Sequence, residues 1–218
     1  MKIAEKISSL LTEIPKNVCL VAVSKTKPLD DIQAAYRAGQ RVFGENKIQE
    51  MTHKWEQLPK DIEWHMIGHV QSNKVKYMAP YVSLIHGVDR AKLLKEIDKQ
   101  AAKNNRSIDC LLQIHIAEEE TKFGLNEAEL FSIVEQQQQQ PFAHLRIVGL
   151  MGMATFTTNT IQIRKEFNTL KKLYERANAM GSGMHILSMG MSGDYPIAIE
   201  EGSTMIRVGS KLFGERNS

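Results

Sequence analysis

The 218 residues include 28 basic and 25 acidic side chains, a formal net charge of +3 with no basic stripe interleaved with aromatic residues, which gives no support to nucleic-acid binding. The chain has no apolar run of about 18 residues and does not open on an apolar segment, so no membrane span or secretion signal is expected. Cys19 and Cys110 lie inside apolar runs and are interpreted as reduced core residues of a cytoplasmic protein.

Strand-like and helix-like segments alternate along the first half of the chain. Residues 18–23 are apolar without helical periodicity, which is typical of a strand buried on both faces inside a parallel sheet. Before them, residues 2–14 show the spacing of an amphipathic helix. The pattern predicts strands at 18–23, 41–43, 63–67 and 82–86, and helices over 2–14, over 29–38, ending at 55, beginning at 71, and beginning with Asp89 as N-cap.

The second half repeats this scheme. It predicts strands at 108–116, 145–151, 185–187 and 205–208, and helices begun by Asn126, carrying 163–177, over 194–201 and at 211–213. Such strand–helix units with short connections predict a (β/α)8 TIM barrel in which residues 1–218 form a single domain without a linker. A doubly wound open sheet is the alternative, but no G-x-G-x-x-G motif follows the first strand.

Lys25 comes directly after the first predicted strand, and Pro28 stops that strand. The carboxyl ends of parallel strands are where α/β folds build their active sites. Partial desolvation at such a place lowers the pKa of a lysine and favours the neutral amine, the nucleophile for a carbonyl group. A surface lysine at a strand end is the alternative interpretation.

Two loops rich in glycine and serine follow the last two predicted strands, at 188–194 and at 209–210. Barrels commonly bind phosphate with this pair of loops, because glycine lets backbone N–H groups approach an anion and serine adds a hydroxyl donor. Tight glycine turns without a ligand are the alternative. Arg207 lies inside the apolar last strand, where a guanidinium needs partners. Together with Lys25, these features suggest pyridoxal 5′-phosphate, held as an internal aldimine.

Four segments give this pattern a family resemblance. They are 23–28 (VSKTKP), 43–46 (FGEN), 64–74 (WHMIGHVQSNK) and 187–192 (LSMGMS). From about Leu20 to Gly214 the chain resembles the pyridoxal-phosphate homeostasis protein family, also called the proline-synthase co-transcribed or alanine-racemase-N-terminal-like family. The resemblance implies a fold-type III barrel with the cofactor on Lys25, and a protein that usually lacks demonstrated turnover.

The resemblance also implies which residues contact the cofactor. It implies Arg207 at the pyridine nitrogen, Ser192, Gly193, Gly209 and Ser210 at the phosphate, and Asn46, His65 and Met151 around the ring. One position departs from the family, since His115 stands where an asparagine is expected. No metal site is expected, because His65 and His69 have no acidic or cysteine partners at ligand spacing.

The residues favour a cofactor-binding protein over an enzyme. A guanidinium facing the pyridine nitrogen disfavours the pyridinium form and makes the ring a poor electron sink. No tyrosine is an obvious second base, Tyr195 beside the 188–194 loop being the nearest candidate. We therefore predict intracellular pyridoxal-phosphate homeostasis, by buffering the cofactor or delivering it to apo-forms of pyridoxal-phosphate enzymes. We expect a monomer without nucleic-acid or membrane partners, in which Lys27 helps to move the cofactor out of the site.

Two alternatives stay open at this point. One is an amino-acid racemase or lyase of low activity that uses the same cofactor. The other is an aldolase that binds a sugar phosphate on a lysine without any cofactor. Visible absorbance of the purified protein would separate the aldolase from the first two, because only the lysine-bound cofactor is coloured.

Overall fold

The structure is a computed structural model, and it describes residues 2–119 and 122–214. The strands are β1 (Cys19–Val23), β2 (Val42–Glu45), β3 (Glu63–Met66), β4 (Leu84–Val88), β5 (Ile108–Ile114), β6 (Leu145–Gly152), β7 (Ile186–Ser188) and β8 (Met205–Val208). The helices are α1 (Ile3–Glu13), α2 (Leu29–Arg37), α3 (Ile48–Gln57), η1 (Ser72–Lys74), α4 (Val75–Met78), α5 (Ala91–Lys103), α6 (Glu127–Gln139), α7 (Thr160–Ala179), α8 (Tyr195–Glu200) and α9 (Ser210–Phe213).

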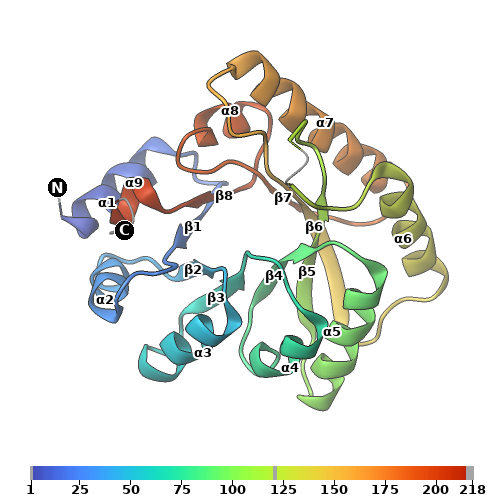
Figure 1. The fold of residues 1–218 in the computed structure, drawn as a ribbon, viewed down its shortest axis with the longest axis horizontal. Coiled ribbons are helices and arrows are strands. Elements are labelled where there is room, and N and C mark those ends of the chain that lie inside the picture. The colour runs from blue at the N-terminus through green and yellow to red at the C-terminus, as the bar shows by residue number, and fades with distance from the viewer. Residues whose placement is uncertain (1, 120–121, 215–218) are drawn as a thin grey trace.

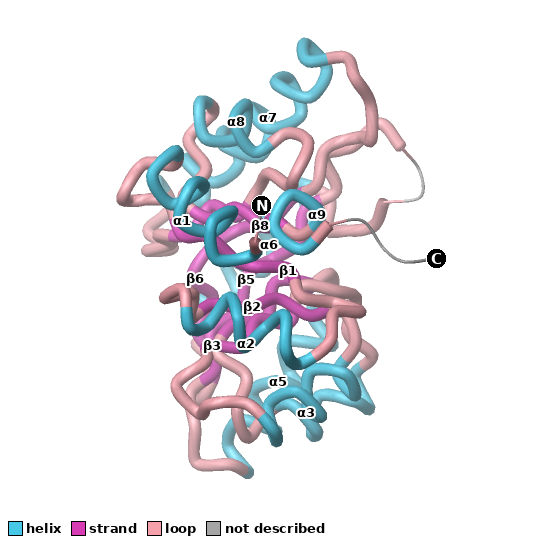
Figure 2. Tube along the Cα trace, turned by 90° about the vertical axis from the view of Figure 1, so that its left-hand side faces the viewer, coloured by secondary structure: helices cyan, strands magenta, loops and turns pink. Residues whose placement is uncertain are grey.

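The strands close into a barrel in chain order. Every neighbouring pair is parallel, and β8 pairs back onto β1 with Cys19 opposite Met205 and Val21 opposite Arg207. Figure 1 shows the helices arranged around the ring of strands, and Figure 2 shows the strands in the middle of the molecule with helices outside them. The predicted (β/α)8 barrel is confirmed, because closure through β1 and β8 excludes an open doubly wound sheet.

Alternate residues of each strand serve two separate layers of packing. In β1, Leu20 and Ala22 belong to the large core between strands and helices. Val21 belongs to a smaller apolar cluster inside the barrel, together with Met151 and Met205. Because successive side chains of a strand point to opposite faces, Val23 and then Lys25 continue the inner series toward the carboxyl end of β1.

Local hydrogen bonds explain where the helices and strands depart from the predicted limits. The prediction that Asp89 is the N-cap of α5 is wrong. Arg90 holds that position, and the Asp89 carboxylate pairs instead with Arg90 and with His69. The strand expected at 82–86 is Leu84–Val88, because the N–H of Val82 donates back to the Met78 carbonyl at 2.8 Å and prolongs the preceding turn. The predicted N-cap of α6, Asn126, is confirmed.

Candidate functional site

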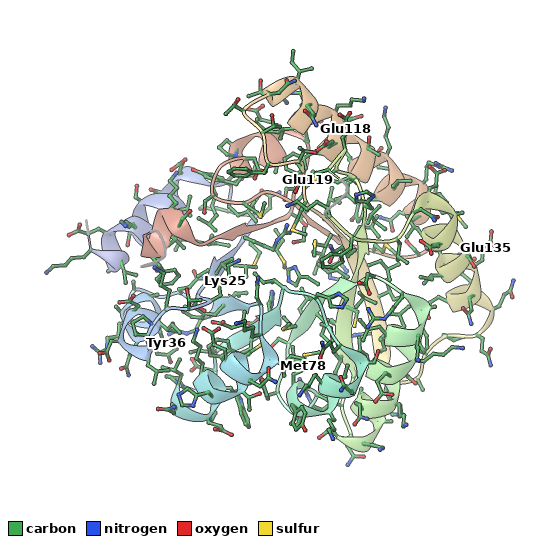
Figure 3. The ribbon with its side chains drawn as sticks, in the orientation of Figure 1. Lys25, Tyr36, Met78, Glu118, Glu119 and Glu135 are labelled. Atoms are coloured by element: carbon green, nitrogen blue, oxygen red, sulfur yellow. The ribbon has the colours of Figure 1, made fainter. Side chains whose placement is uncertain are left out.

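A cavity of about 700 Å³ opens at the carboxyl ends of the strands. Closure of a parallel barrel brings the loops after all strands to one mouth, which is why residues far apart in the chain meet there. Figure 3 shows Lys25 on the β1–β2 side of the barrel and Glu118 and Glu119 on the far side of it. Among the predicted cofactor-binding residues, those that line the cavity are Lys25, Asn46, Ser192, Gly193, Arg207, Gly209 and Ser210.

Lys25 lies in a tight turn that follows β1. The N–H of Lys27 donates to the carbonyl of Ser24 at 3.0 Å and closes the turn. Lys25 itself is half-buried, whereas Val21 and Val23, which precede it on the same face of the strand, are buried. The lysine stem therefore leaves an apolar floor and enters the cavity.

Arg207 stands between the cavity and a buried chain of polar side chains. Its guanidinium donates to Ser188 Oγ at 2.6 Å and to the carbonyl of Gly152 at 3.0 Å. Ser188 Oγ lies 3.3 Å from His86 Nδ1, and His86 Nε2 lies 3.1 Å from His65 Nδ1. Because arginine can only donate, Ser188 Oγ accepts from Arg207 and keeps its own hydroxyl hydrogen for another partner. Burial lowers the pKa of Arg207 to about 10, so the guanidinium stays charged at neutral pH.

His65 and Met151 lie below the cavity and not on its wall. His65 is buried on β3, and burial lowers its pKa to about 3, so the imidazole is neutral at physiological pH. Met151 is fully buried in the apolar cluster inside the barrel. For these two residues, direct contact with a cofactor ring stays a prediction.

The loops after β7 and β8 are tied together and offer hydrogen-bond donors. Ser192 Oγ accepts from the N–H of Gly209 at 3.1 Å. Within the described part of the chain, the backbone N–H groups of Ser192, Gly193 and Ser210 have no acceptor. Gly190 has a φ of +97°, and a Cβ there would lie 2.6 Å from a side-chain carbon of α8. Unbonded N–H groups on closely packed glycine loops are suited to holding an anion.

Glu166, on α7, fastens two further loops at the mouth of the cavity. Its buried carboxylate accepts from the N–H and the Oγ1 of Thr155, at 2.6 and 2.7 Å, and from the N–H of Glu118 at 3.1 Å. Burial favours the neutral acid, but these hydrogen bonds outweigh it and hold the pKa of Glu166 below its usual value. Thr155 and the 94% exposed Phe156 are thereby placed on the cavity wall.

Sequence reasoning missed the buried polar residues that support the cavity from outside. They are Glu45, Lys54, His86 and Glu166, all at most 4% exposed. For His86 a signal existed, since a polar side chain inside an apolar strand needs a partner. His115, the departure from the family, is exposed, with Nε2 lying 3.3 Å from the carbonyl of Glu119.

Tyrosines and metal ligands were the other candidate groups in the sequence. The Tyr195 hydroxyl points away from the cavity, donating to Glu13 of α1 and accepting from Lys211 of α9. No tyrosine lines the cavity in the described ranges. In the same ranges, no cluster of three or more His, Cys, Asp or Glu side chains could hold a metal ion, and no helix is long and apolar enough to cross a membrane.

Comparison with known proteins covers almost the whole chain. Residues 1–217 match the family model for the alanine racemase N-terminal domain. A pyridoxal phosphate homeostasis protein of Aquifex aeolicus is 39% identical, and the match covers 99% of each chain. The structure of PipY of Synechococcus elongatus without PLP has a TM-score of 0.92 at 36% identity and covers 97% of this chain and 100% of PipY; the structure of PipY with PLP bound has a TM-score of 0.89.

The same comparison reaches proteins that share only the fold. An alanine racemase of Streptomyces lavendulae has a TM-score of 0.82 at 15% identity. The match covers 100% of this chain but 58% of that enzyme. This likeness supports the barrel architecture derived above.

Proposed function

Because the chain belongs to the alanine racemase N-terminal domain family, and within it to the pyridoxal phosphate homeostasis proteins, we propose that it binds pyridoxal 5′-phosphate and serves in pyridoxal-phosphate homeostasis. One observation carries the proposal. A lysine, an arginine and two loops with unbonded N–H groups, contributed by β1, β8 and the turns after β7 and β8, face one cavity. These groups match the three parts of the cofactor, an aldehyde, a pyridine nitrogen and a phosphate.

The donors around the cavity fit the phosphate. Ser192, Gly193 and Ser210 would hold it through backbone N–H groups, and Gly209 keeps the loop after β8 close to Ser192. A Cβ at Gly209 would lie 3.2 Å from the Val23 carbonyl, so a glycine lets this loop lie against the end of β1. Hydrogen bonds of this kind to a charged group are each worth about 1.5–3 kcal/mol.

Arg207 and Lys25 would hold the other two parts. When bound, the cofactor supplies an aldehyde that a lysine amine captures reversibly, and Lys25 is the lysine of the apolar floor. Arg207 would donate to the pyridine nitrogen and, being charged, would disfavour its protonation. An unprotonated ring withdraws electrons poorly, which supports storage and delivery over turnover.

The delivery role adds recipients and a compartment to the proposal. We propose that apo-forms of pyridoxal-phosphate enzymes accept the cofactor from a monomer of this protein in the cytoplasm. The two cysteines support a reducing compartment, because both are free. Burial raises the pKa of Cys19 to about 11, so its thiol is poorly reactive at neutral pH.

Absorbance and transfer experiments test this function. Purified protein mixed with pyridoxal 5′-phosphate should become coloured, and borohydride should fix the cofactor to the peptide carrying Lys25. Lys25→Ala should stay colourless. Loaded protein should restore activity to an apo-enzyme that uses this cofactor. Full colour in Lys25→Ala would overturn the lysine assignment, and rapid racemisation or lyase turnover of amino acids by loaded protein would favour the enzyme alternative.

A further inference from the structure

A buried ionic cluster lies under the turn that carries Lys25. The Lys54 ammonium donates to Glu45 Oε1 at 2.8 Å, to Glu50 Oε1 at 2.7 Å and to the carbonyl of Ser24 at 2.8 Å. The Ser24 hydroxyl also donates to Glu45 Oε1, at 2.6 Å. We call Lys54, Glu45, Glu50 and Ser24 the Lys54 cluster. All three N–H donors of the ammonium are therefore engaged.

None of the four residues of the cluster lines the cavity. Glu45 ends β2, and Glu50 and Lys54 are one turn apart on α3. The Glu45 side chain is fully buried and that of Lys54 is 4% exposed, whereas that of Glu50 is 24% exposed. The cluster therefore reaches the cavity through the backbone next to it, above all through the turn at Ser24–Lys27, to which Lys54 and Glu50 both bond.

That turn has a strained residue next to Lys25. Thr26 has a φ of +64°, in the left-handed region that β-branched residues rarely occupy. Its N–H donates to Glu50 Oε1 at 2.6 Å, and the preceding Ser24 carbonyl is held by Lys54. The cluster thus forms hydrogen bonds with the backbone of the turn on both sides of Lys25, at Ser24 and at Thr26. Strain of this kind persists only where the surroundings over-determine the backbone.

Stability alone does not account for a buried cluster at this place. Taking charges out of water costs about as much as their attraction returns, so well-packed apolar side chains would stabilise the fold equally well. In addition, Glu45 Oε2 is buried without a hydrogen-bond partner in the described structure. What the charges provide is a fixed geometry of the turn, since Lys54 holds the Ser24 carbonyl and Glu50 holds the Thr26 N–H.

We propose that Glu50 and Lys54 are positioning residues that hold the Thr26 turn in its strained form and thereby aim Lys25 at the cofactor's aldehyde. The inference rests on the proposed function. The bond concerned forms between Lys25 Nζ and the aldehyde carbon, with the aldehyde oxygen and two amine hydrogens leaving as water; release is the reverse hydrolysis. The donors proposed for the phosphate lie on the loops after β7 and β8, which Glu50 and Lys54 do not contact, so the two parts of cofactor binding can be separated.

The experiment compares two ligands on wild type, Glu50→Ala and the double variant Glu50→Ala/Thr26→Gly. Pyridoxal 5′-phosphate reports the lysine bond together with the phosphate and ring contacts, and deoxypyridoxine phosphate, which has a methyl group in place of the aldehyde, reports the phosphate and ring contacts without the lysine bond. Glu50→Ala should slow the appearance of the lysine-bond absorbance by about tenfold or more, because small misplacements of a reacting group have effects of that order. Its affinity for deoxypyridoxine phosphate should stay unchanged.

The double variant tests the strain itself. Glycine adopts a positive φ without strain, so Thr26→Gly should return the rate of bond formation in the Glu50→Ala background toward that of wild type. Glu127→Ala is the matched control, because Glu127 pairs with Arg176 on the exposed surface of α6 and α7. Glu127→Ala should change neither the rate of lysine-bond formation with pyridoxal 5′-phosphate nor the affinity for deoxypyridoxine phosphate.

Each result decides between the inference and the proposed function. Equal rates in wild type and Glu50→Ala would overturn the inference, as would an equal loss of affinity for both ligands, which would indicate general disruption. Failure of glycine to restore the rate would also overturn it, since strain at Thr26 would then not be what Glu50 holds. If wild type binds neither ligand, the proposed function fails and the inference fails with it.

Discussion

The two sides of the cavity are built in different ways. On one side, the turn after β1 is held by side-chain charges of the Lys54 cluster, buried under Lys25. On the other side, the loops after β7 and β8 are held by close glycine packing and by backbone hydrogen bonds, from the N–H of Gly209 to Ser192 Oγ and from the N–H of Arg207 to the Gly190 carbonyl. The first side, which we call the lysine side, positions the amine of Lys25. The second side, which we call the phosphate side because the proposed phosphate donors lie there, presents several backbone N–H groups.

This difference determines what each side is sensitive to. Charges that are buried as a set are sensitive to the loss of any one member, because the remaining charges are left unpaired. Backbone donors do not depend on side-chain identity, but they are sensitive to any atom that prevents close approach. The lysine side should therefore fail through a lost charge, and the phosphate side through an added carbon.

Lys54→Met should have the largest effect on stability. It removes the ammonium and leaves the fully buried Glu45 carboxylate without a cation, which costs about 3–5 kcal/mol. Urea unfolding would measure the change in the free energy of unfolding. The control is Lys165→Met, because Lys165 pairs with Glu118 in the open, where an ion pair is worth about 0–1 kcal/mol. A loss no larger than that of the control would show that charge does not hold the lysine side.

Gly190→Ala should have the next largest effect, on the phosphate side. Its positive φ and its 2.6 Å approach to Ala198 Cβ combine backbone strain with overpacking, which we expect to cost about 2–4 kcal/mol. Gly183→Ala separates the two causes, because Gly183 also has a positive φ, but nothing lies within 4 Å of its Cβ position. Urea unfolding that gives equal losses would mean that close packing is not what requires glycine at Gly190.

The phosphate side should contribute more to affinity than the lysine bond does. Unphosphorylated pyridoxal carries the same aldehyde but lacks the group that Ser192, Gly193 and Ser210 would hold. Loss of several hydrogen bonds to a charged group predicts an affinity at least about tenfold weaker than that of the phosphate ester. Titration followed by visible absorbance gives both constants. Similar constants for the two ligands would contradict the division of roles between the two sides.

The two sides also differ in how far the sequence predicts them. Barrel order follows from local patterns, since short apolar runs and amphipathic helices alternate along the chain. Once that order is known, Lys25, Arg207 and the loops after β7 and β8 are brought to one mouth by topology alone. The residues lining the phosphate side could thus be predicted from position and residue type.

The support of the lysine side could not be predicted in this way. Glu50 and Lys54, four residues apart on a helix, are typical of an exposed surface pair worth a few tenths of a kcal/mol. Here Lys54 is buried and Glu50 partly buried, because α3 packs against the end of β2 and the turn after β1. Likewise, Asp89 has the residue type of an N-cap, yet its two carboxylate oxygens pair with His69 and Arg90 and not with the N–H groups of α5. Tertiary partners decide such cases, and they leave no local pattern.

Acid should weaken the lysine side through Glu50. Burial opposes ionisation of Glu50, but hydrogen bonds from Lys54 and the Thr26 N–H outweigh burial and hold its pKa below the usual value. Its carboxylate therefore contributes stability above its unfolded pKa, about 4.3, and that contribution is lost as pH falls through the lower folded pKa. In urea unfolding across this range, Glu50→Gln should lose less stability than wild type. If the free energy of unfolding fell with pH equally in wild type and Glu50→Gln, the assignment to Glu50 would be contradicted. The control Glu127→Gln should lose as much stability as wild type does over this range.

Lys27 joins the two sides, and its substitution should have the smallest effect on equilibrium binding. Its ammonium donates to the carbonyls of Phe213 and Gly214, at 3.0 and 3.2 Å, so it links the turn after β1 to the end of α9. It also lines the cavity two residues beyond Lys25, where an amine could take over the aldehyde during release. Lys27→Ala should therefore leave cofactor affinity unchanged and slow transfer to an apo-enzyme, measured as the rate of regained activity. Lys99→Ala, on the exposed face of α5, is the control. If the transfer rate were unchanged, Lys27 would only link the two sides, and the cofactor would be released from Lys25 directly. If cofactor affinity were weakened, the link through Lys27 would be needed to hold the phosphate side in place.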